Sequence, residues 1–559
     1  MIKKVFNIFN KEINGLLEAA YLLGLFAILS QILALFRDRI LAGTFGASRI
    51  LDIYYASFGI PDFVFVTIAS MVSISVLVPF ITNRLEKSKE ETVYFINSIF
   101  SFFCLIIIIV CIGFFIFIPY LVPKIFPGIT DQLTLIKMAR ILLLSPILLG
   151  LSNFLASITQ VGKRFLVYAL SPIFYNLGII FGAIFLYPIF GIYGLAYGVI
   201  FGAFMHLGIQ LPFVFKSGLF KFWPFVFDFS LIKEIFLISI PRTITLGMTQ
   251  ITTLVLAGMA SLMQIGSISI FNFSNNLQSV PFSIIGVSYS LAAFPTLSKF
   301  ISKNQNKEFL FHISTAIRHI IFWSIPISIL FIILRAQIVR TIYGTGVFNW
   351  NSTKLTAATL AIFALSITAQ SLVLIFIRGY YAKGNTKKSL YAGIITGILS
   401  ISFSFLFVKI FNQIIIFRYF IEHLFRVDDI VGTEVLMLAL GFSLAQIINC
   451  IILWILFEKE NRGFSSILSK TLFQSFSASV IMGFITYLCL GIFNNIFNIN
   501  TLLGIFMQGF CSGIIGIFFL IIILKILKSS ELEETINTLH KKFWKTKPII
   551  PDIDVEDLK

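Results

Sequence analysis

Three charged residues in a row, Arg37, Asp38 and Arg39, stand at the end of an otherwise apolar segment. If that segment crosses a membrane, each charge is expensive, by about 2.5–3.5 kcal/mol on insertion scales, and invites a functional interpretation. A guanidinium can grip a phosphate through two parallel hydrogen bonds. We therefore expect Arg37 to bind an anionic group inside a cavity, with Arg39 closer to the membrane surface.

Carboxylates close to this group supply its expected counter-charge. Asp38 directly follows Arg37, so the two side chains should point in different directions around a helix. Asp52, early in the next apolar segment, is then the expected counter-ion of Arg37, and Asp62 lies further along the same segment. The competing interpretation is a structural ion pair, or residues at the outer membrane interface.

A polar helix face lies in the second half of the chain. Neutral polar residues occur there with the i, i+3, i+4, i+7 spacing that places side chains on one face of a helix. Such a face either lines a cavity or joins helices through hydrogen bonds, because contact with lipid would leave its polar groups unsatisfied. The residues that make it are Asn272, Asn275, Asn276 and Ser279.

The sequence contains none of the common catalytic motifs. There is no phosphate-binding loop, no HExxH pair, no nucleophile elbow and no cluster of His and Cys, so we predict neither an enzyme nor a metal or cofactor site. His206 is interpreted as a packed, hydrogen-bonded core residue, and the five cysteines as apolar-segment residues that form no disulfide. Without an ATP site, any driving force must be an ion gradient, the membrane potential or a substrate gradient.

The segments that must position these residues are long and apolar. Of the 559 residues, 58% are hydrophobic and 12% charged. A membrane core about 30 Å thick needs roughly 20 apolar helical residues per crossing, and only helices or closed barrels satisfy their backbone in lipid. We predict an all-α polytopic membrane protein with about fourteen spans, near 17–42, 50–82, 93–121, 132–160, 164–187, 191–215, 231–262, 266–298, 309–334, 354–382, 387–411, 433–457, 471–494 and 500–527.

The loop charges predict the orientation. Lys and Arg collect in alternate loops, as the positive-inside rule requires, so both termini should be cytoplasmic. The net charge of +17 has the same cause, and we expect no nucleic-acid partner. Residues 1–16 are expected to form an amphipathic segment on the membrane, Leu532–Trp544 an amphipathic helix on the inner leaflet, and 551–559 a disordered acidic end.

The chain contains an internal repeat. ILAG at 40–43 matches VLAG at 255–258, and LVPFI at 77–81 matches AFPTL at 293–297. A polar insertion at 412–432 accounts for the wider offset between LAYG at 195–198 and LALG at 438–441. Two six-helix lobes related in this way usually enclose a central cavity with alternating access. We expect an N-lobe at 17–215, a C-lobe at 216–457, two extra helices at 458–527 and a cytoplasmic tail at 528–559.

The sequence resembles the MurJ (MviN) family of lipid II flippases, in the multidrug/oligosaccharidyl-lipid/polysaccharide exporter superfamily. The resemblance implies two lobes around a cavity, a lipid-facing groove formed by the last two helices, and a bacterial inner-membrane protein of cell-wall biogenesis. It also implies outward flipping of an undecaprenyl-pyrophosphate-linked peptidoglycan precursor. The stretches that carry it are RDRILAGTFGAS at 37–48, GKRFLVYALSPIFYNLGII at 162–180, GIYGLAYG at 191–198, LPFVFK at 211–216, GTGVFNWNSTKLTAATL at 344–360 and RGYYAKGNTKKSL at 378–390.

The resemblance also assigns residues. By position, Arg37 matches a pyrophosphate-binding arginine and Asp52 a family aspartate. Other family charges are replaced: Gln31 and Phe65-Val66 stand where the family has arginines, and Asn276 and Ser279 where it has an arginine and a glutamate. We expect Arg37, Arg39, Asp52, Asn272 and Asn276 to bind substrate, and Asp38, Gln31, Ser279 and Arg242 to line the cavity or form ion pairs.

Other functions remain open at this stage. The absence of several family arginines is compatible with a flippase for another polyprenyl-linked oligosaccharide. It is also compatible with a membrane scaffold that transports nothing. An exporter of cationic drugs fits less well, because it needs an acidic cavity. The expected partners are a lipid-linked anionic glycan and membrane lipids. The sequence leaves open whether the protein acts beside cell-wall synthases, and nothing in it requires an oligomer.

Overall fold

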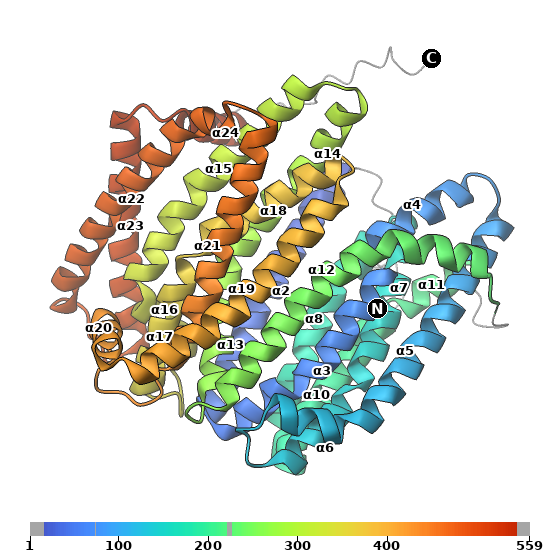
Figure 1. Ribbon diagram of the computed structural model, residues 1–559, viewed down its shortest axis with the longest axis horizontal. Coiled ribbons are helices and arrows are strands. Elements are labelled where there is room, and N and C mark those ends of the chain that lie inside the picture. The colour runs from blue at the N-terminus through green and yellow to red at the C-terminus, as the bar shows by residue number, and fades with distance from the viewer. Residues whose placement is uncertain (1–15, 73, 221–225, 545–559) are drawn as a thin grey trace.

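The computed structural model describes residues 16–72, 74–220 and 226–544, and every regular element within them is helical. Figure 1 shows the N-terminal helices, blue to cyan, beside the C-terminal helices, yellow to red, with α12 between them. The helices of the first half are α2 (Leu16–Phe45), α3 (Arg49–Met71), α4 (Ile74–Leu85), α5 (Lys89–Ile125), α6 (Gln132–Leu142), α7 (Leu144–Val161), α8 (Phe165–Phe181), η1 (Gly182–Leu186), α9 (Tyr187–Phe190), α10 (Ile192–Gly208) and α11 (Leu211–Ser217).

The second half is also entirely helical within the described residues. Its helices are α12 (Phe229–Ser261), α13 (Ser267–Phe282), η2 (Ser283–Val287), α14 (Ser288–Ser302), α15 (Asn306–Ile333), α16 (Arg335–Tyr343), α17 (Trp350–Ala364), α18 (Ile367–Ala382), α19 (Thr386–Gln413), α20 (Ile415–Phe425), α21 (Val435–Glu460), α22 (Phe464–Asn494), α23 (Leu502–Ile526) and α24 (Ser530–Trp544). The segments η1 and η2 are single π-helical turns.

The predicted all-α polytopic membrane fold is confirmed. Within the described residues, twelve helical segments are long and apolar enough to cross a membrane, and a thirteenth is α17 with α18, bent by 41°. The expected count of about fourteen also included the segment at 17–42. The structure forms that segment as the 30-residue helix α2, which lies outside those thirteen.

The bend between α17 and α18 has a local cause. At the break, the Ser366 hydroxyl donates to the carbonyl of Phe363, 2.8 Å away, and the Gln370 side-chain amide donates to the Ser366 hydroxyl. A side chain that satisfies a freed carbonyl lets a buried helix bend without leaving a backbone group unpaired.

The two halves share one large hydrophobic core. This cluster joins α2, α3, α5 and α7 of the first half to α13, α16, α17 and the start of α21, and it also includes Ile232 and Ile235 near the start of α12. Within the second half, α14, α15, α18 and the end of α21 form a separate cluster. We call the end that holds α6 and α20 the outer end, following the loop-charge prediction, and the end that holds α14 and α24 the inner end (Figure 1).

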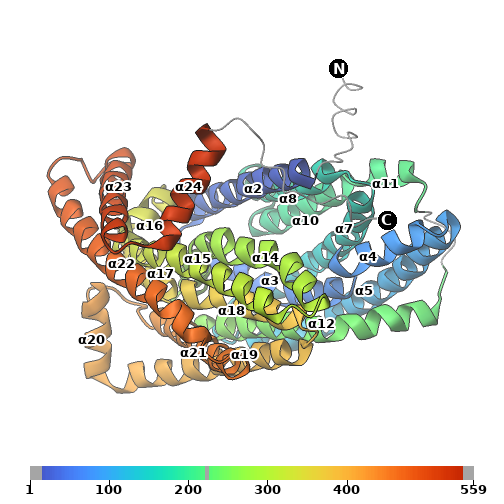
Figure 2. The same cartoon turned by 90° about the horizontal axis from the view of Figure 1, so that it is seen from above.

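The last two spans pack on the second half. In the view of Figure 2, α22 and α23 lie at the edge of the molecule away from α5. They contact each other, and α22 also packs on α15. Ala478, Met482 and Leu520 bury a small apolar cluster there.

The segment 412–432 differs from the polar stretch expected from the sequence. Most of it forms α20, which presents Ile416, Tyr419 and Phe420 outward, with Ile416 82% exposed. Its buried Glu422 accepts hydrogen bonds from Arg418, 3.0 Å away, and from Thr433, 2.6 Å away. A helix that exposes apolar side chains on its outer face, and whose buried polar groups are hydrogen-bonded within the protein, is typical of the membrane interface.

The tail forms the helix expected near Leu532–Trp544, and its first turn is anchored. Glu531 is buried and accepts hydrogen bonds from Thr471 at 2.7 Å and Ser529 at 3.0 Å, with Arg318 at 3.7 Å. Burial raises the pKa of Glu531, but these hydrogen bonds and the nearby guanidinium together bring it below its ordinary value. The expected amphipathic segment 1–16 and acidic end 551–559 fall outside the described residues, apart from Leu16.

Candidate functional site

A polar cavity of about 360 Å³ lies between the two halves. The first half contributes side chains from α2, α3, α7, α8 and the end of α5, and the second half from α12 and α13. On α3 the lining begins at Tyr54, after the start of that helix at Arg49 and after Asp52. Its lining residues are Arg37, Asp38, Leu41, Tyr54, Tyr55, Phe58, Gly59, Asp62, Phe65, Phe126, Leu149, Tyr175, Ile179, Gln250, Thr253, Leu254, Ala257, Asn272 and Asn276.

Arg37 is held at the cavity wall by a hydrogen-bond network. Its Nε and Nη2 donate to Asp38 Oδ1 at 2.9 and 2.7 Å, and its Nη1 donates to Asn176 Oδ1 at 2.9 Å. The other oxygen of Asp38 accepts from Asn276 Nδ2 at 2.9 Å. The network therefore joins α2, α8 and α13 across the two halves.

The expectation that Arg37 and Asp38 diverge was wrong. Their backbone positions are about 100° apart around the helix, but the arginine side chain is long enough to fold back onto the neighbouring carboxylate. The Asp38 side chain is 2% exposed, whereas that of Arg37 is 20% exposed. The guanidinium thus faces the cavity while its counter-ion is buried behind it.

Asp62 brings a second carboxylate to the cavity. It lies in the middle of α3, seven residues after Tyr55 on the same helix face. Within the part of the chain that the structure describes, it makes no hydrogen bond or ion pair. Among the lining residues that the structure describes, one cation, Arg37, therefore stands beside two carboxyl groups, Asp38 and Asp62.

Asp52 is not the counter-ion of Arg37. It is buried at the outer end, where its oxygens accept from the backbone N–H of Gly266 at 2.5 Å and of Ser269 at 2.9 Å. The hydroxyl of Ser269 donates to it as well, at 2.7 Å. These are donors at the start of α13, so Asp52 caps that helix from the opposite half of the molecule.

Arg39 likewise lies outside the cavity lining. Its Nη1 donates to the carbonyls of Thr341 at 2.5 Å and Ile342 at 3.1 Å, at the end of α16. Close by, the N–H of Val347 donates to the carbonyl of Gly43 at 3.0 Å. We call the contacts of Arg39, Gly43 and Asp52 with the second half the outer gate, and in this structure the gate is closed.

The polar face of α13 divides between two roles. Asn272 and Asn276 line the cavity. Asn275 instead accepts from Gln278, whose side-chain oxygen accepts from Gln370 of α18 at 3.1 Å. Ser279 donates to the carbonyl of Asn276 at 2.7 Å and stays outside the lining. The sequence left two roles open for this polar face, lining a cavity or joining helices. In the structure its residues perform both.

Of the two remaining candidates, Gln31 lies away from the cavity lining. It is on α2, nearly two turns before Arg37, and is half-buried. Arg242 belongs to α12, but its side chain lies outside the described residues. No cluster of three or more metal-ligating side chains occurs in the described part of the chain.

Sequence reasoning missed several lining residues. Tyr54, Tyr55 and Tyr175 bring phenol groups to the cavity, and Asn176 binds Arg37 from α8. For α3 a signal existed, since Tyr55, Gly59 and Asp62 share one helix face and Asp62 is an ionisable residue inside a span. For Asn176 no signal existed, because only the packing of α8 on α2 brings it to Arg37.

Known proteins resemble this chain over most of its length. The model of the family "Lipid II flippase MurJ" matches residues 41–508. A "Probable lipid II flippase MurJ" of Thermotoga maritima is 27% identical over 518 residues, covering 92% of this chain and 97% of that protein. One from Buchnera aphidicola subsp. Acyrthosiphon pisum is 28% identical over 396 residues, covering 69% and 77%.

Solved structures show the same fold. "Lipid II flippase MurJ, inward closed conformation" superposes with a TM-score of 0.72 at 25% identity, covering 92% of this chain and 100% of that one. An inward-facing multidrug resistance MATE family transporter superposes with a TM-score of 0.62 at 15% identity, covering 78% and 95%. At that identity the second likeness concerns the fold alone.

Proposed function

The chain belongs to the lipid II flippase MurJ family, and from this premise we propose that it moves lipid II from the inner to the outer leaflet by alternating access. It is a transporter of the multi-pass membrane class and not an enzyme. We propose the cavity between the lobes at 17–215 and 216–457 as the binding site of the lipid headgroup.

The observation that carries this proposal is the position of Arg37. Its guanidinium faces a polar cavity between the halves, just inside a closed outer gate. A pyrophosphate that enters from the inner side can take over the hydrogen bonds that Arg37 now donates to Asp38. The side-chain amides of Asn272 and Asn276 offer further donors from the opposite wall.

Transport then requires the gate to alternate. Opening the outer end means separating Asp52 from the start of α13 and Arg39 from the end of α16. Asp52 and Arg39 therefore serve the proposed function as gate residues rather than as substrate ligands. The apolar core shared by the halves must separate at the same end.

The carboxyl group of Asp62 indicates how transport is driven. An unpaired carboxylate beside an entering pyrophosphate repels it, unless a proton or another cation enters too. We propose that Asp62 takes up that positive charge, which would couple the flip to an ion gradient or to the membrane potential.

A flippase for another polyprenyl-linked oligosaccharide is the second candidate. It is favoured by the charge of the lining, because among the described lining residues Arg37 is the single basic one and two carboxyl groups accompany it. Such a substrate shares the polyprenyl and phosphate chemistry of lipid II and differs in the glycan.

The proposal is tested by replacing Arg37. In cells that depend on this protein, Arg37→Ala should abolish the outward exposure of lipid II on intact spheroplasts, while the total pool of lipid II rises. Losing a charge-assisted grip on phosphate should lower transport by about 100-fold or more.

The matched control is Arg49→Ala. Arg49 has the same charge, lies at the outer start of α3 and is exposed outside the cavity lining, so its loss should leave lipid II exposure unchanged. If depletion of the protein leaves exposure unchanged, lipid II is the wrong cargo and the second candidate takes its place. If Arg37→Ala inserts normally and still transports, Arg37 does not hold the headgroup.

The remaining expectations are proposals of the same kind. We propose that both termini lie in the cytoplasm, as the loop charges predict. A monomer is sufficient for the proposed function, since the described chain supplies both walls of the cavity. Cell-wall synthases are natural partners, because they consume lipid II on the outer side.

A further inference from the structure

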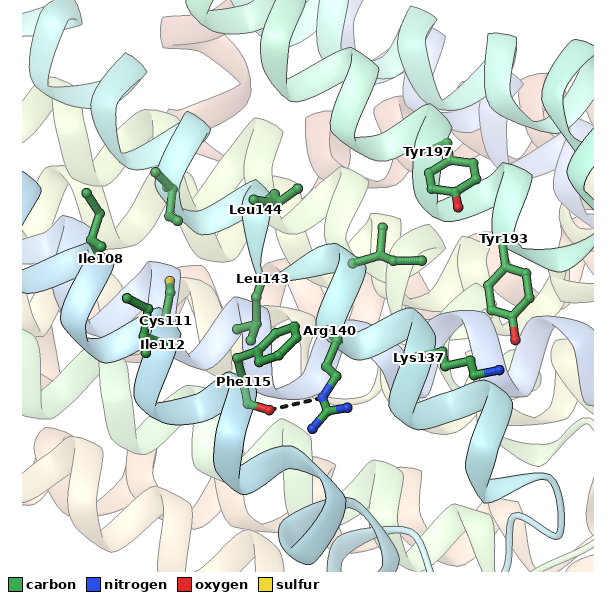
Figure 3. Close-up of a pocket in the computed structure, with 12 residues that line it drawn as sticks. Ile108, Cys111, Ile112, Phe115, Lys137, Arg140, Leu143, Leu144, Tyr193 and Tyr197 are labelled. Atoms are coloured by element: carbon green, nitrogen blue, oxygen red, sulfur yellow. Dashed lines mark hydrogen bonds between the residues drawn. The ribbon is translucent and has the colours of Figure 1, made fainter.

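A second pocket lies on the flank of the first half, away from the cavity. It has a volume of about 570 Å³, within the usual range of ligand pockets. Figure 3 shows it, with Ile108 and Ile112 towards one end and Lys137 and Tyr193 towards the other. Its walls come from α5, α6, the start of α7 and the start of α10, and it shares no lining residue with the central cavity.

The apolar part of this flank pocket is open to the surroundings of the protein. Ile112 is 56% exposed, Phe115 47% and Leu144 52%. Both α5 and the segment formed by α6 and α7 are membrane-spanning by length and composition. Exposed apolar walls on spanning helices face lipid chains, so the flank pocket is a recess in the membrane-facing surface.

Two cations stand at the rim of the flank pocket. Lys137 and Arg140 are three residues apart on α6 and therefore share a helix face. Arg140 is held in place, because its Nε donates to the carbonyl of Phe115 at 3.0 Å and its guanidinium lies 4.5 Å from the centre of the Phe115 ring. Lys137 is exposed.

The positive charge at this rim is uncompensated. Neither Lys137 nor Arg140 forms an ion pair with any carboxylate that the structure describes, and no acidic residue lines the flank pocket. The guanidinium of Arg140 uses one N–H on the carbonyl of Phe115 and keeps its other N–H donors for a ligand. The rim therefore offers one anchored and one exposed positive charge to an anion beside an apolar surface.

Tyrosines place this rim at the level of the lipid headgroups. Tyr193 and Tyr197 come from the first two turns of α10 and line the same pocket. Tyr, Lys and Arg gather where hydrocarbon meets the headgroups, because one end of each side chain is apolar and the other polar. In the proposed orientation, the rim lies in the outer leaflet. The positive-inside rule accounts for cations on the cytoplasmic side, so it does not account for Lys137 and Arg140.

We propose that the flank pocket binds an anionic glycerophospholipid of the outer leaflet, such as phosphatidylglycerol. The headgroup phosphate lies against Lys137 and Arg140, with the phenol of Tyr193 as a further donor. An acyl chain lies along Ile108, Ile112 and Leu144. This assignment rests on the flank alone and does not depend on which lipid the central cavity transports.

The test uses the full-length protein in proteoliposomes with a photoactivatable phosphatidylglycerol that carries a diazirine in one acyl chain. After illumination, labelled peptides are mapped by mass spectrometry. We expect labelling of residues 108–115, and competition by unlabelled phosphatidylglycerol but not by phosphatidylcholine. Lys137→Gln with Arg140→Gln should lower that labelling by about tenfold, because each basic residue near the surface contributes to holding an anionic lipid.

Two controls make the result specific. Labelling of the exposed α23 surface near Phe510 and Phe518 should not change in the double variant, which also reports that the protein is folded. Lys303→Gln with Lys307→Gln removes the same charge from an exposed inner loop and should leave labelling of 108–115 unchanged.

Three outcomes would overturn the proposal. The first is equal labelling by phosphatidylglycerol and phosphatidylcholine probes. The second is labelling of 108–115 that survives the loss of both cations. The third is displacement of the probe by a polyprenyl phosphate at lower concentration than by phosphatidylglycerol, which would assign the flank pocket to a polyprenyl lipid. A Lys137→Arg variant should retain the labelling.

Discussion

At the scale of single residues, the charges inside the spans serve two different tasks. Arg37 and Asp38 form a network at the cavity wall, whereas Asp52 and Arg39 close the outer gate. The gate contacts are hydrogen bonds between a charged side chain and backbone groups at helix ends. Such bonds are strong yet local, so breaking a few of them can release one half from the other.

The gate role of Asp52 leads to a prediction about conformation. In Asp52→Asn, an amide N–H₂ group replaces one carboxylate oxygen and faces donors of Gly266 and Ser269, so a hydrogen bond is lost. We expect this change to shift the equilibrium towards the outward-open state by about 2 kcal/mol. Ser269→Ala removes one of the three hydrogen bonds to Asp52 and should shift it by about 1 kcal/mol.

Spin-label distances measure this shift. Labels at Leu133→Cys on α6 and Val431→Cys before α21 lie on exposed residues at the outer ends of the two halves. In a background without the five native cysteines, Asp52→Asn should move the distance distribution to longer values. A distribution identical to that of the parent protein would show that Asp52 does not hold the gate.

At the scale of elements, close helix packing positions the cavity wall. Gly178 of α8 and Gly182 of η1 face Gly198 and Gly202 of α10 so closely that an added Cβ on Gly178 or Gly198 would collide with the opposite backbone. Small residues let helices approach in this way without a hydrophobic driving force. The contact fixes α8, which carries Asn176 to Arg37.

Enlarging one of these glycines should therefore affect stability and the site together. Gly198→Val should push α10 from α8 and destabilise the protein by about 1–3 kcal/mol, as overpacking does. The readout is the apparent Tm of the purified protein in detergent, together with lipid II exposure in cells.

The control for this prediction is Gly113→Val. Gly113 lies on α5, and nothing is within 4 Å of the position that its Cβ would take. It adds the same side chain to a spanning helix at a site with open space, so it should leave Tm unchanged. Equal Tm values for the two variants would contradict the proposed role of the seam between α8 and α10.

At the scale of the whole molecule, the way the buried apolar residues are grouped fits a conformation that is closed at the outer end. One large buried apolar cluster joins the halves and includes α2, α13 and α16 beside the outer gate, whereas α14, α15 and α18 at the inner end bury a cluster of their own. A transporter closed at one end by core-like packing must exchange that packing for another arrangement when it alternates. The proposed direction of transport depends on which end faces the cytoplasm.

Orientation can be measured directly. In the cysteine-free background, Leu133→Cys at the outer end should react with a membrane-impermeant maleimide on intact cells. Lys303→Cys, in the exposed loop after α14, should react only after permeabilisation, because the loop charges place it in the cytoplasm. The reverse pattern would invert the assignment of inner and outer ends.

The sequence by itself determined the class of the protein, most of its spans and its family. Hydrophobic length determines the class and the spans, since each span must match the thickness of the hydrocarbon core whatever its neighbours are. The family was recognised from stretches such as RDRILAGTFGAS at 37–48. It also identified Arg37, Asn272 and Asn276, which are polar residues that a lipid-facing helix would not tolerate. It did not identify α20, because a short apolar face within charged residues gives no span signal.

Only the tertiary structure decided what each polar residue contacts. Helical periodicity gives the direction of a side chain around its own axis but not the helix it meets. Asp52 reaches Gly266, and Arg39 reaches Thr341, across more than 200 residues of chain. The partners of Asp38 include both its immediate neighbour and Asn276. These pairings depend on how two halves of the chain pack, and packing is decided by the whole surface of each helix rather than by any local pattern.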